Sequence, residues 1–179
     1  QTPGKRSPVW PDGTQLFEGE FNRAIVNRLM KKCEDNGIDA VNLVDTPKDI
    51  SLTERVNTAN KLAKSSQKPC IYVSIHADAY SKDESANGWS VYTSPGTTKS
   101  DSIATILFEK AAREFKGEYM RSDKYSDGDV DKEAKFTVLM DTSMPAILSE
   151  NFFMTNSDNC HKYLLSEEGR DRIAKIHFQ

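Results

Sequence analysis

The stretch "PCIYVSIHA" (residues 69–77) decides the fold, because it is an almost unbroken run of apolar and β-branched residues. Such a run predicts a strand that is buried on both faces, as in a parallel sheet. The preceding stretch, "SLTERVNTANKLAKSS" (51–66), starts with Ser51 and has Glu54 three residues later, the capping-box pattern that opens a helix. A helix followed by a buried strand indicates an α/β domain.

The same alternation continues on both sides of this pair. Apolar residues recur every four positions between residues 16 and 36, which predicts one face of an amphipathic helix that Gly37 ends. Further strands are expected at 39–45, 88–93, 136–140 and 145–153, and further helices at 100–117 and 166–178. Together these elements predict a single α/β domain, in which a mostly parallel, twisted sheet of about six strands is flanked by helices.

The N-terminal part departs from the usual order of an α/β domain. A Pro- and Gly-rich loop (residues 1–15) leads straight into the first helix, whereas a strand normally precedes such a loop. We therefore expect the first strand of the sheet to be missing from this chain.

Composition and charge narrow the possible partners. The 179 residues suit one domain with a substantial core. A net charge of −3 gives no bulk attraction to nucleic acid or to an anionic membrane. No window approaches the roughly 18 apolar residues of a membrane-spanning helix. The dispersed Cys33, Cys70 and Cys160 are expected to be buried thiols rather than a disulfide framework.

Three polar residues stand where an α/β sheet binds ligands, which is beyond the carboxyl ends of its strands. His76 ends the 69–77 strand, Glu150 ends the 145–150 strand, and Glu18 opens the first helix. A histidine and a carboxylate that converge there can form part of a metal site, with the second carboxylate left as a base. The alternatives are a histidine packed at a strand end and a glutamate that favours the helix dipole.

One polar segment, residues 116–135, is too long for a plain connection, so it is either mobile or a functional loop. Within it, Asp127, Asp129 and Asp131 are spaced like the start of an EF-hand loop. The glycine is misplaced, however, and position twelve would be Val138 instead of a glutamate. A solvated acidic loop is the preferred interpretation.

Four segments in sequence order resemble the zinc-dependent N-acetylmuramoyl-L-alanine amidases of the type-3 amidase family. They are "LFEGEFNRAIVNRL", "LTERVNTANKL", "SIHADA" and "MPAILSENFFMTN". The family shows a glutamate opening the first helix in an "E-x-x-x-N" pattern, "SIHAN" closing a strand, and "P-x-x-L-x-E-x-x-F-x-x-N" near the end. The resemblance runs from about residue 3 to the last helix.

The resemblance assigns roles to these positions. It implies that Glu18 and His76 are ligands of one zinc ion and that Glu150 is the catalytic carboxylate. It implies that Asn156 shapes the loop after Glu150. Arg55 matches a position that usually holds arginine, with a structural role or a role at the edge of the substrate.

Two departures from the family pattern stand out. The family normally carries another zinc histidine in a "GHG" motif that ends the first strand, so the third ligand is expected upstream of Gln1. Neither His161 nor His177 sits in a matching context. Asp78 stands where the family most often has asparagine. It could orient His76 through a contact behind the ligand, or it could cap the loop.

The resemblance implies hydrolysis of the amide bond between N-acetylmuramic acid and L-alanine in bacterial peptidoglycan. Residues 1–179 would then be a catalytic amidase domain, trimmed at both ends, that acts as a monomer on the glycan strand and its stem peptide. A regulatory protein or a flanking wall-binding domain is a possible further partner. The site of action would be extracytoplasmic (periplasm, cell wall or secreted) or reached through a phage. The alternative is a non-catalytic peptidoglycan-binding module on the same fold.

Overall fold

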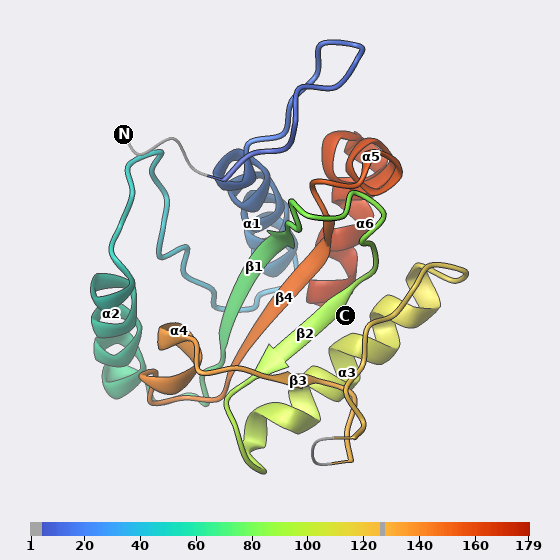
Figure 1. Ribbon diagram of the computed structural model, residues 1–179. Coiled ribbons are helices and arrows are strands. Elements are labelled where there is room, and N and C mark those ends of the chain that lie inside the picture. The colour runs from blue at the N-terminus through green and yellow to red at the C-terminus, as the bar shows by residue number, and fades with distance from the viewer. Residues whose placement is uncertain (1–4, 126–127) are drawn as a thin grey trace.

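A four-stranded sheet in the order β1-β4-β2-β3 forms the centre of the computed structural model, which describes residues 5–125 and 128–179 (Figure 1). β1 (Tyr72–Asp78) pairs in parallel with β4 (Ala146–Phe153). β4 pairs antiparallel with β2 (Ser90–Thr93), which in turn pairs in parallel with the short β3 (Lys132–Glu133). The predicted α/β class is confirmed, and the sheet is mixed because β2 runs against β4.

Helices cover both faces of the sheet. α1 (Glu18–Asp35), α3 (Lys99–Glu114) and α6 (Glu167–Phe178) contribute to the larger apolar cluster, and α2 (Leu52–Ser65) and the short α4 (Thr137–Met140) to the smaller one. The larger cluster includes Phe21, Ile25, Ile75, Val91, Ala104, Leu107, Ile147 and Ile173. The smaller one includes Val56, Ala59, Tyr72, Leu139, Ala146 and Leu148. Alternate residues of β1 and β4 therefore face opposite helical layers, as the pleat of a strand requires.

The remaining segments lie outside the sheet and its main helices. α5 (Ser157–Asn159) leads into a π-helical segment, η1 (Cys160–Leu165), which packs against α6. The 5–17 segment forms a long loop that projects beyond α1 (Figure 1). In the parts of the chain that the structure describes, no helix has the length and apolar character needed to cross a membrane. The three cysteines are free, with Cys33 and Cys160 buried and Cys70 partly exposed.

Two predicted strands are wrong. Residues 136–140 form helix α4, in which the neighbours Val138 and Leu139 are both buried instead of alternating. A run of five mostly apolar residues is too short to distinguish the periodicity of a helix from that of a strand. Packing against α2 favours the helix here. Residues 39–45 form no strand, because no described strand pairs with them. The sheet therefore keeps three of the five strands predicted within the chain and adds the short β3, which was not predicted.

A groove runs along the edge of β1 that faces away from β4. Its volume is about 1690 Å³, and it is lined by α1, the 37–49 segment, α2 and β1, including Ser74 and His76. Within the described residues, β1 has a hydrogen-bonded neighbour on its β4 side alone. The groove therefore exposes the free backbone edge of β1, the outermost strand of the sheet, next to His76.

Candidate active site

His76 and Glu150 are direct register partners on the parallel strands β1 and β4. His76 has the same parity along β1 as Tyr72, and Glu150 has the same parity along β4 as Leu148, so both side chains leave the sheet on the α2/α4 face. Both stand near the carboxyl ends of their strands. The structure thus brings together two residues that the sequence places at separate strand ends.

Glu18 reaches the same place from the start of α1. The loop before it is braced by backbone hydrogen bonds from Ser7 N to the carbonyl of Leu16 (3.0 Å) and from Glu18 N to the carbonyl of Lys5 (2.9 Å). The side chain of Glu18 is buried, and its Oε1 lies 2.8 Å from Nδ1 of His76. The three residues assigned by the family resemblance therefore form one cluster.

The electrostatics of this cluster are dominated by buried carboxylates. Burial above all, followed by the charges of Asp78 and Glu18, raises the pKa of Glu150 to about 8. Burial also raises the pKa of Glu18, but the hydrogen bond and charge of His76, together with Lys5, more than compensate, so that this pKa is lowered. Oε2 of Glu150 is buried and has no hydrogen-bond partner among the described residues. A buried carboxylate oxygen without a partner is costly unless it serves a ligand or a reaction.

The donor set of this cluster fits a zinc ion. Catalytic zinc takes three protein ligands, and imidazole nitrogen with carboxylate oxygen is a common combination. Ligand atoms of a tetrahedral zinc lie about 3.3 Å apart, so His76 Nδ1 and Glu18 Oε1 would have to separate by only about 0.5 Å. The other ring nitrogen of His76, Nε2, lies 3.0 Å from Oγ of Ser74, which holds the orientation of the ring.

Asp78 follows His76 at the end of β1, after a register shift between the two residues. Its Oδ1 accepts a hydrogen bond of 2.8 Å from the backbone N of Ala79. Burial raises the pKa of Asp78, while Arg121, Lys132 and the same backbone hydrogen bond oppose the rise. The ring nitrogens of His76 contact Glu18 and Ser74 and not Asp78. Of the two roles considered for Asp78, the structure therefore contains the contact that caps the loop.

Arg55 and Asn156 both hold loops. Arg55 donates from Nε to the carbonyl of Ile50 (2.8 Å) and pairs with Asp49 (3.3 Å), in the segment before α2. Asn156 caps α5, because its side chain accepts a hydrogen bond from the backbone N of Asn159 (2.9 Å). Its Nδ2 also donates to the carbonyl of Glu84 (3.1 Å).

The structure adds one residue that sequence reasoning missed, Asn151. This fully buried side chain accepts a hydrogen bond from Nε1 of Trp89 (2.8 Å) and donates one to the carbonyl oxygen of His76 (2.9 Å). It lies on the opposite face of β4 from Glu150 and ties β1 to the segment before β2. The available signal was an amide side chain in the middle of a strand that begins and ends with apolar residues, since a buried amide needs partners.

The two other histidines lie elsewhere. His161 packs on the ring of Trp10 and lies 3.3 Å from Oδ2 of Asp12. His177 lies in α6 with Nε2 2.8 Å from Oγ of Ser149, on the face of β4 opposite Glu150. The Glu18, His76 and Glu150 cluster therefore receives no second histidine from the described residues.

Comparisons with known proteins agree with the interpretation of this cluster as an active site. Residues 2–179 match the family described as N-acetylmuramoyl-L-alanine amidase. The crystal structure of N-acetylmuramoyl-L-alanine amidase from Clostridium difficile 630 is 25% identical, with a TM-score of 0.79 over 99% of this chain and 86% of that one. The amidase AmiC2 of Nostoc punctiforme is 24% identical, with a TM-score of 0.76 over 98% of this chain and 84% of that one. The uncharacterized protein YqiI of Bacillus subtilis is 29% identical over 162 residues, which are 90% of this chain and 71% of YqiI.

Proposed function

Because the chain belongs to the N-acetylmuramoyl-L-alanine amidase family, we propose that it cleaves peptidoglycan by zinc-dependent hydrolysis. The bond cleaved is the amide that joins N-acetylmuramic acid to L-alanine of the stem peptide. The observation that carries the proposal is the meeting of Glu18, His76 and Glu150 at the carboxyl ends of β1 and β4. Two of these residues form a donor pair for zinc, and the third is a buried carboxylate with an unpartnered oxygen.

Glu18 and His76 would supply two of the protein ligands, and the family resemblance leads us to propose a histidine outside residues 1–179 as the third. The groove along the free edge of β1 supports this proposal, because a further strand paired there would end beside His76. A bound zinc ion supplies an acidified water and polarises the scissile carbonyl.

Glu150 would move the proton in this reaction. We propose that it accepts a proton from the attacking water and returns it to the nitrogen of L-alanine as the carbon–nitrogen bond breaks. The products would be a free lactyl carboxyl group on the sugar and a free amino terminus on the peptide. Burial of Glu150 keeps bulk water from competing for this proton.

Basic groups near the cluster suit an acidic stem peptide. Lys5, Arg121 and Lys132 all act electrostatically on Asp78. The guanidinium of Arg121 lies 4.8 Å from the ring centroid of Phe153, and Nζ of Lys132 lies 5.5 Å from that of Tyr92. We propose that Arg121 and Lys132 attract carboxylates of the stem peptide toward Glu150.

The proposal is tested with the full-length, zinc-loaded protein and purified bacterial cell walls. New L-alanine amino termini should appear, and they should disappear on chelation and return when zinc is added. Glu150→Gln should lower the rate by about 100-fold to 10,000-fold, because it removes the general base. The exposed Glu34→Gln serves as the matched control and should retain the wild-type rate.

The alternative function, a non-catalytic peptidoglycan-binding module, predicts a different outcome of the same assay. The wild-type protein would then bind cell walls without releasing any amino termini. If Glu150→Gln released amino termini at the wild-type rate, Glu150 would not be the base.

We further propose that residues 1–179 constitute the catalytic domain and that it works outside the cytoplasm, where its substrate lies. Fractionation of the producing cells, or of a phage lysate, should place the protein with the cell wall, the periplasm or the medium. Recovery from the cytoplasm alone would contradict this location.

A further inference from the structure

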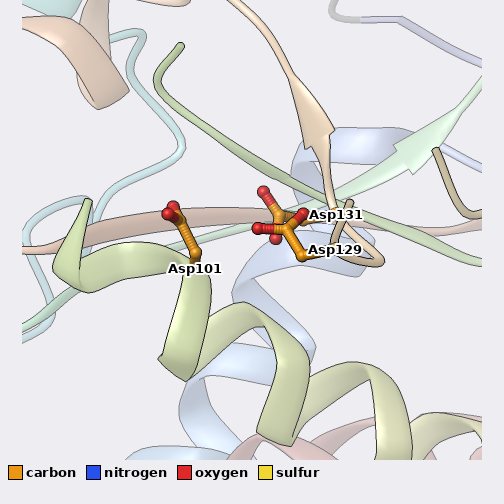
Figure 2. A group of neighbouring side chains, drawn as sticks. All are labelled: Asp101, Asp129 and Asp131. Atoms are coloured by element: carbon orange, nitrogen blue, oxygen red, sulfur yellow. The ribbon is translucent and has the colours of Figure 1, made fainter. Parts of the chain in front are cut away.

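Three aspartates gather at a place remote from the active site. One carboxylate oxygen from each of Asp101, Asp129 and Asp131 lies within 4.8 Å of the other two. Figure 2 shows Asp129 and Asp131, from the segment before β3, side by side, with Asp101 opposite them at the start of α3. Asp101 and Asp131 are buried, and Asp129 is partly buried.

The acidic cluster and Glu150 lie at opposite ends of β2. Asp131 contacts Thr93, at one end of β2, whereas the register partner of Glu150 is Ser90, at the other end. Three residues of a strand span about 10 Å. The acidic cluster is therefore a second site and does not share its ligands with Glu18 and His76.

Asp131 has a buried carboxylate oxygen whose hydrogen-bonding capacity the described residues leave unused. It is only 1% exposed, and its Oδ2 accepts a hydrogen bond of 2.6 Å from Oγ1 of Thr93. Its Oδ1 is buried without a hydrogen-bond partner among the described residues. Burial above all, followed by the neighbouring Asp129 and Asp101, raises the pKa of Asp131 to about 7 against the effect of Thr93. A buried, ionised carboxylate beside two others is unfavourable unless a neighbouring cation or a proton offsets its charge, and its raised pKa reflects this cost.

Asp101 retains the capacity to bind a cation. It completes the capping box of α3, accepting hydrogen bonds from the backbone N (2.6 Å) and Oγ1 (2.8 Å) of Thr98. Each carboxylate oxygen has a second lone pair, so these bonds leave acceptor sites open. The capping box also fixes the carboxylate in one position, which lowers the entropic cost of binding an ion.

We propose that Asp101, Asp129 and Asp131 bind a hard divalent cation, with Ca²⁺ as the expected ion. The donors are all oxygens, which suit Ca²⁺ and Mg²⁺, whereas zinc sites in proteins are built mainly from nitrogen and sulfur. Ca²⁺ binds its oxygen ligands at about 2.4 Å, so three oxygens that lie within 4.8 Å of one another can all reach one ion.

The ion would fasten the segment before β3 to β2 and to the start of α3. Lys132 follows Asp131 directly and pairs in register with Tyr92. Its ammonium group lies over the Tyr92 ring and acts on Asp78. The cation thus holds in place the strand that presents Lys132 to the active site. This replaces the interpretation of a solvated acidic loop for Asp129 and Asp131, because Asp131 is buried, whereas Asp127 lies outside the described residues.

The test uses the full-length, zinc-loaded protein, freed of other metals by dialysis against metal-depleted buffer, with CaCl₂ and MgCl₂ as probes. Calorimetry should show about one Ca²⁺ bound per chain. At a Ca²⁺ concentration about 100 times its Kd, the Tm should rise by about 5 °C or more. Asp131→Asn should abolish both signals, whereas the exposed Asp158→Asn and the active-site variant Glu150→Gln should keep them.

Because the side chain of asparagine is nearly isosteric with that of aspartate and removes a buried charge, Asp131→Asn should fold with a Tm in metal-free buffer at least equal to that of the wild type. If it fails to fold, Asp129→Asn is the second variant and should weaken Ca²⁺ binding at least tenfold. The proposal is overturned if neither Ca²⁺ nor Mg²⁺ gives heat or raises the Tm, or if the folded variants respond like the wild type.

Discussion

Nδ2 of Asn151 donates a hydrogen bond of 2.9 Å to the carbonyl oxygen of His76, across the pair β1–β4 and directly behind the candidate active site. Its Oδ1 holds the indole N–H of Trp89 at the same time. Asn151→Leu removes both bonds, together with the one that Nδ2 donates to Oγ of Ser149 (3.0 Å), so the indole N–H of Trp89 and the carbonyl of His76 lose their partner in Asn151. Each such group costs about 1–3 kcal/mol, so we expect a loss of about 2–5 kcal/mol in the free energy of unfolding.

Urea denaturation of the full-length protein measures this loss. Asn60→Ala is the matched control. The side chain of Asn60 donates a hydrogen bond to the carbonyl of Asp141 and accepts one from the backbone N of Ser143, but both bonds lie at the exposed surface. The substitution should cost less than about 1 kcal/mol. Equal losses for the two variants would show that Asn151 has no special role.

The local elements were predictable because local interactions determine them. Ser51 caps α2 as predicted, since its side chain accepts a hydrogen bond from the backbone N of Glu54 (3.2 Å). The four-residue spacing before Gly37 gives α1 with an error of two residues or fewer at each end. Both features depend on residues within one or two turns of each other.

Long-range contacts account for what the sequence did not predict. Val138 and Leu139 form a helix because α2 lies against them, and the burial of Asp131 depends on Thr93, which is far away in the chain. The residues of the candidate site could be proposed from the sequence because they stand at the ends of predicted elements and match the family's motifs. Asn151 was not, because its partners, Trp89 and His76, are known only once the strands are paired.

Arg170 links α6 to the first turn of α1, two residues beyond Glu18. Its two terminal nitrogens bind the carboxylate of Glu20 at 2.8 and 2.7 Å, and its Nε donates to the carbonyl of Leu164. Arg170→Lys cannot make this bidentate contact, so we expect a loss of about 1–3 kcal/mol in chemical denaturation. The exposed pair of Arg113 with Glu109 gives the control, because Arg113→Lys should change stability by less than about 0.5 kcal/mol.

His177 makes the folded protein sensitive to acid. Burial lowers the pKa of His177 from 6.5 to about 4, so the unfolded chain binds a proton more readily than the folded one. Its contribution to stability is therefore complete above about pH 6.5 and is lost as the pH falls toward 4. We expect a loss on the order of 1–3 kcal/mol over this range. His177→Gln should flatten this part of the stability profile, and an NMR titration of the His177 ring with a pKa above 6 would contradict the prediction.

Lys132 is expected to affect substrate affinity more than turnover. If it attracts a carboxylate of the stem peptide, Lys132→Gln should raise KM for soluble wall fragments about threefold to tenfold, which corresponds to about 0.5–1.5 kcal/mol of binding energy. The value of kcat should change less, and added salt should reduce the difference between variant and wild type. The exposed Lys135→Gln is the control and should leave KM unchanged. An unchanged KM for Lys132→Gln would remove this residue from substrate binding.

The contact between Glu18 and His76 makes a prediction about metal content that does not depend on activity. Each residue is proposed to supply one zinc ligand, so Glu18→Ala and His76→Ala should each lower the zinc affinity by several orders of magnitude, and elemental analysis should find much less than one zinc per chain. Glu150→Gln, which keeps both ligands, should retain about one zinc while losing activity. This pattern separates binding of the metal from proton transfer. If His76→Ala retained a full zinc complement and the wild-type affinity, the ion would be bound elsewhere, and the assignment of this site would be wrong.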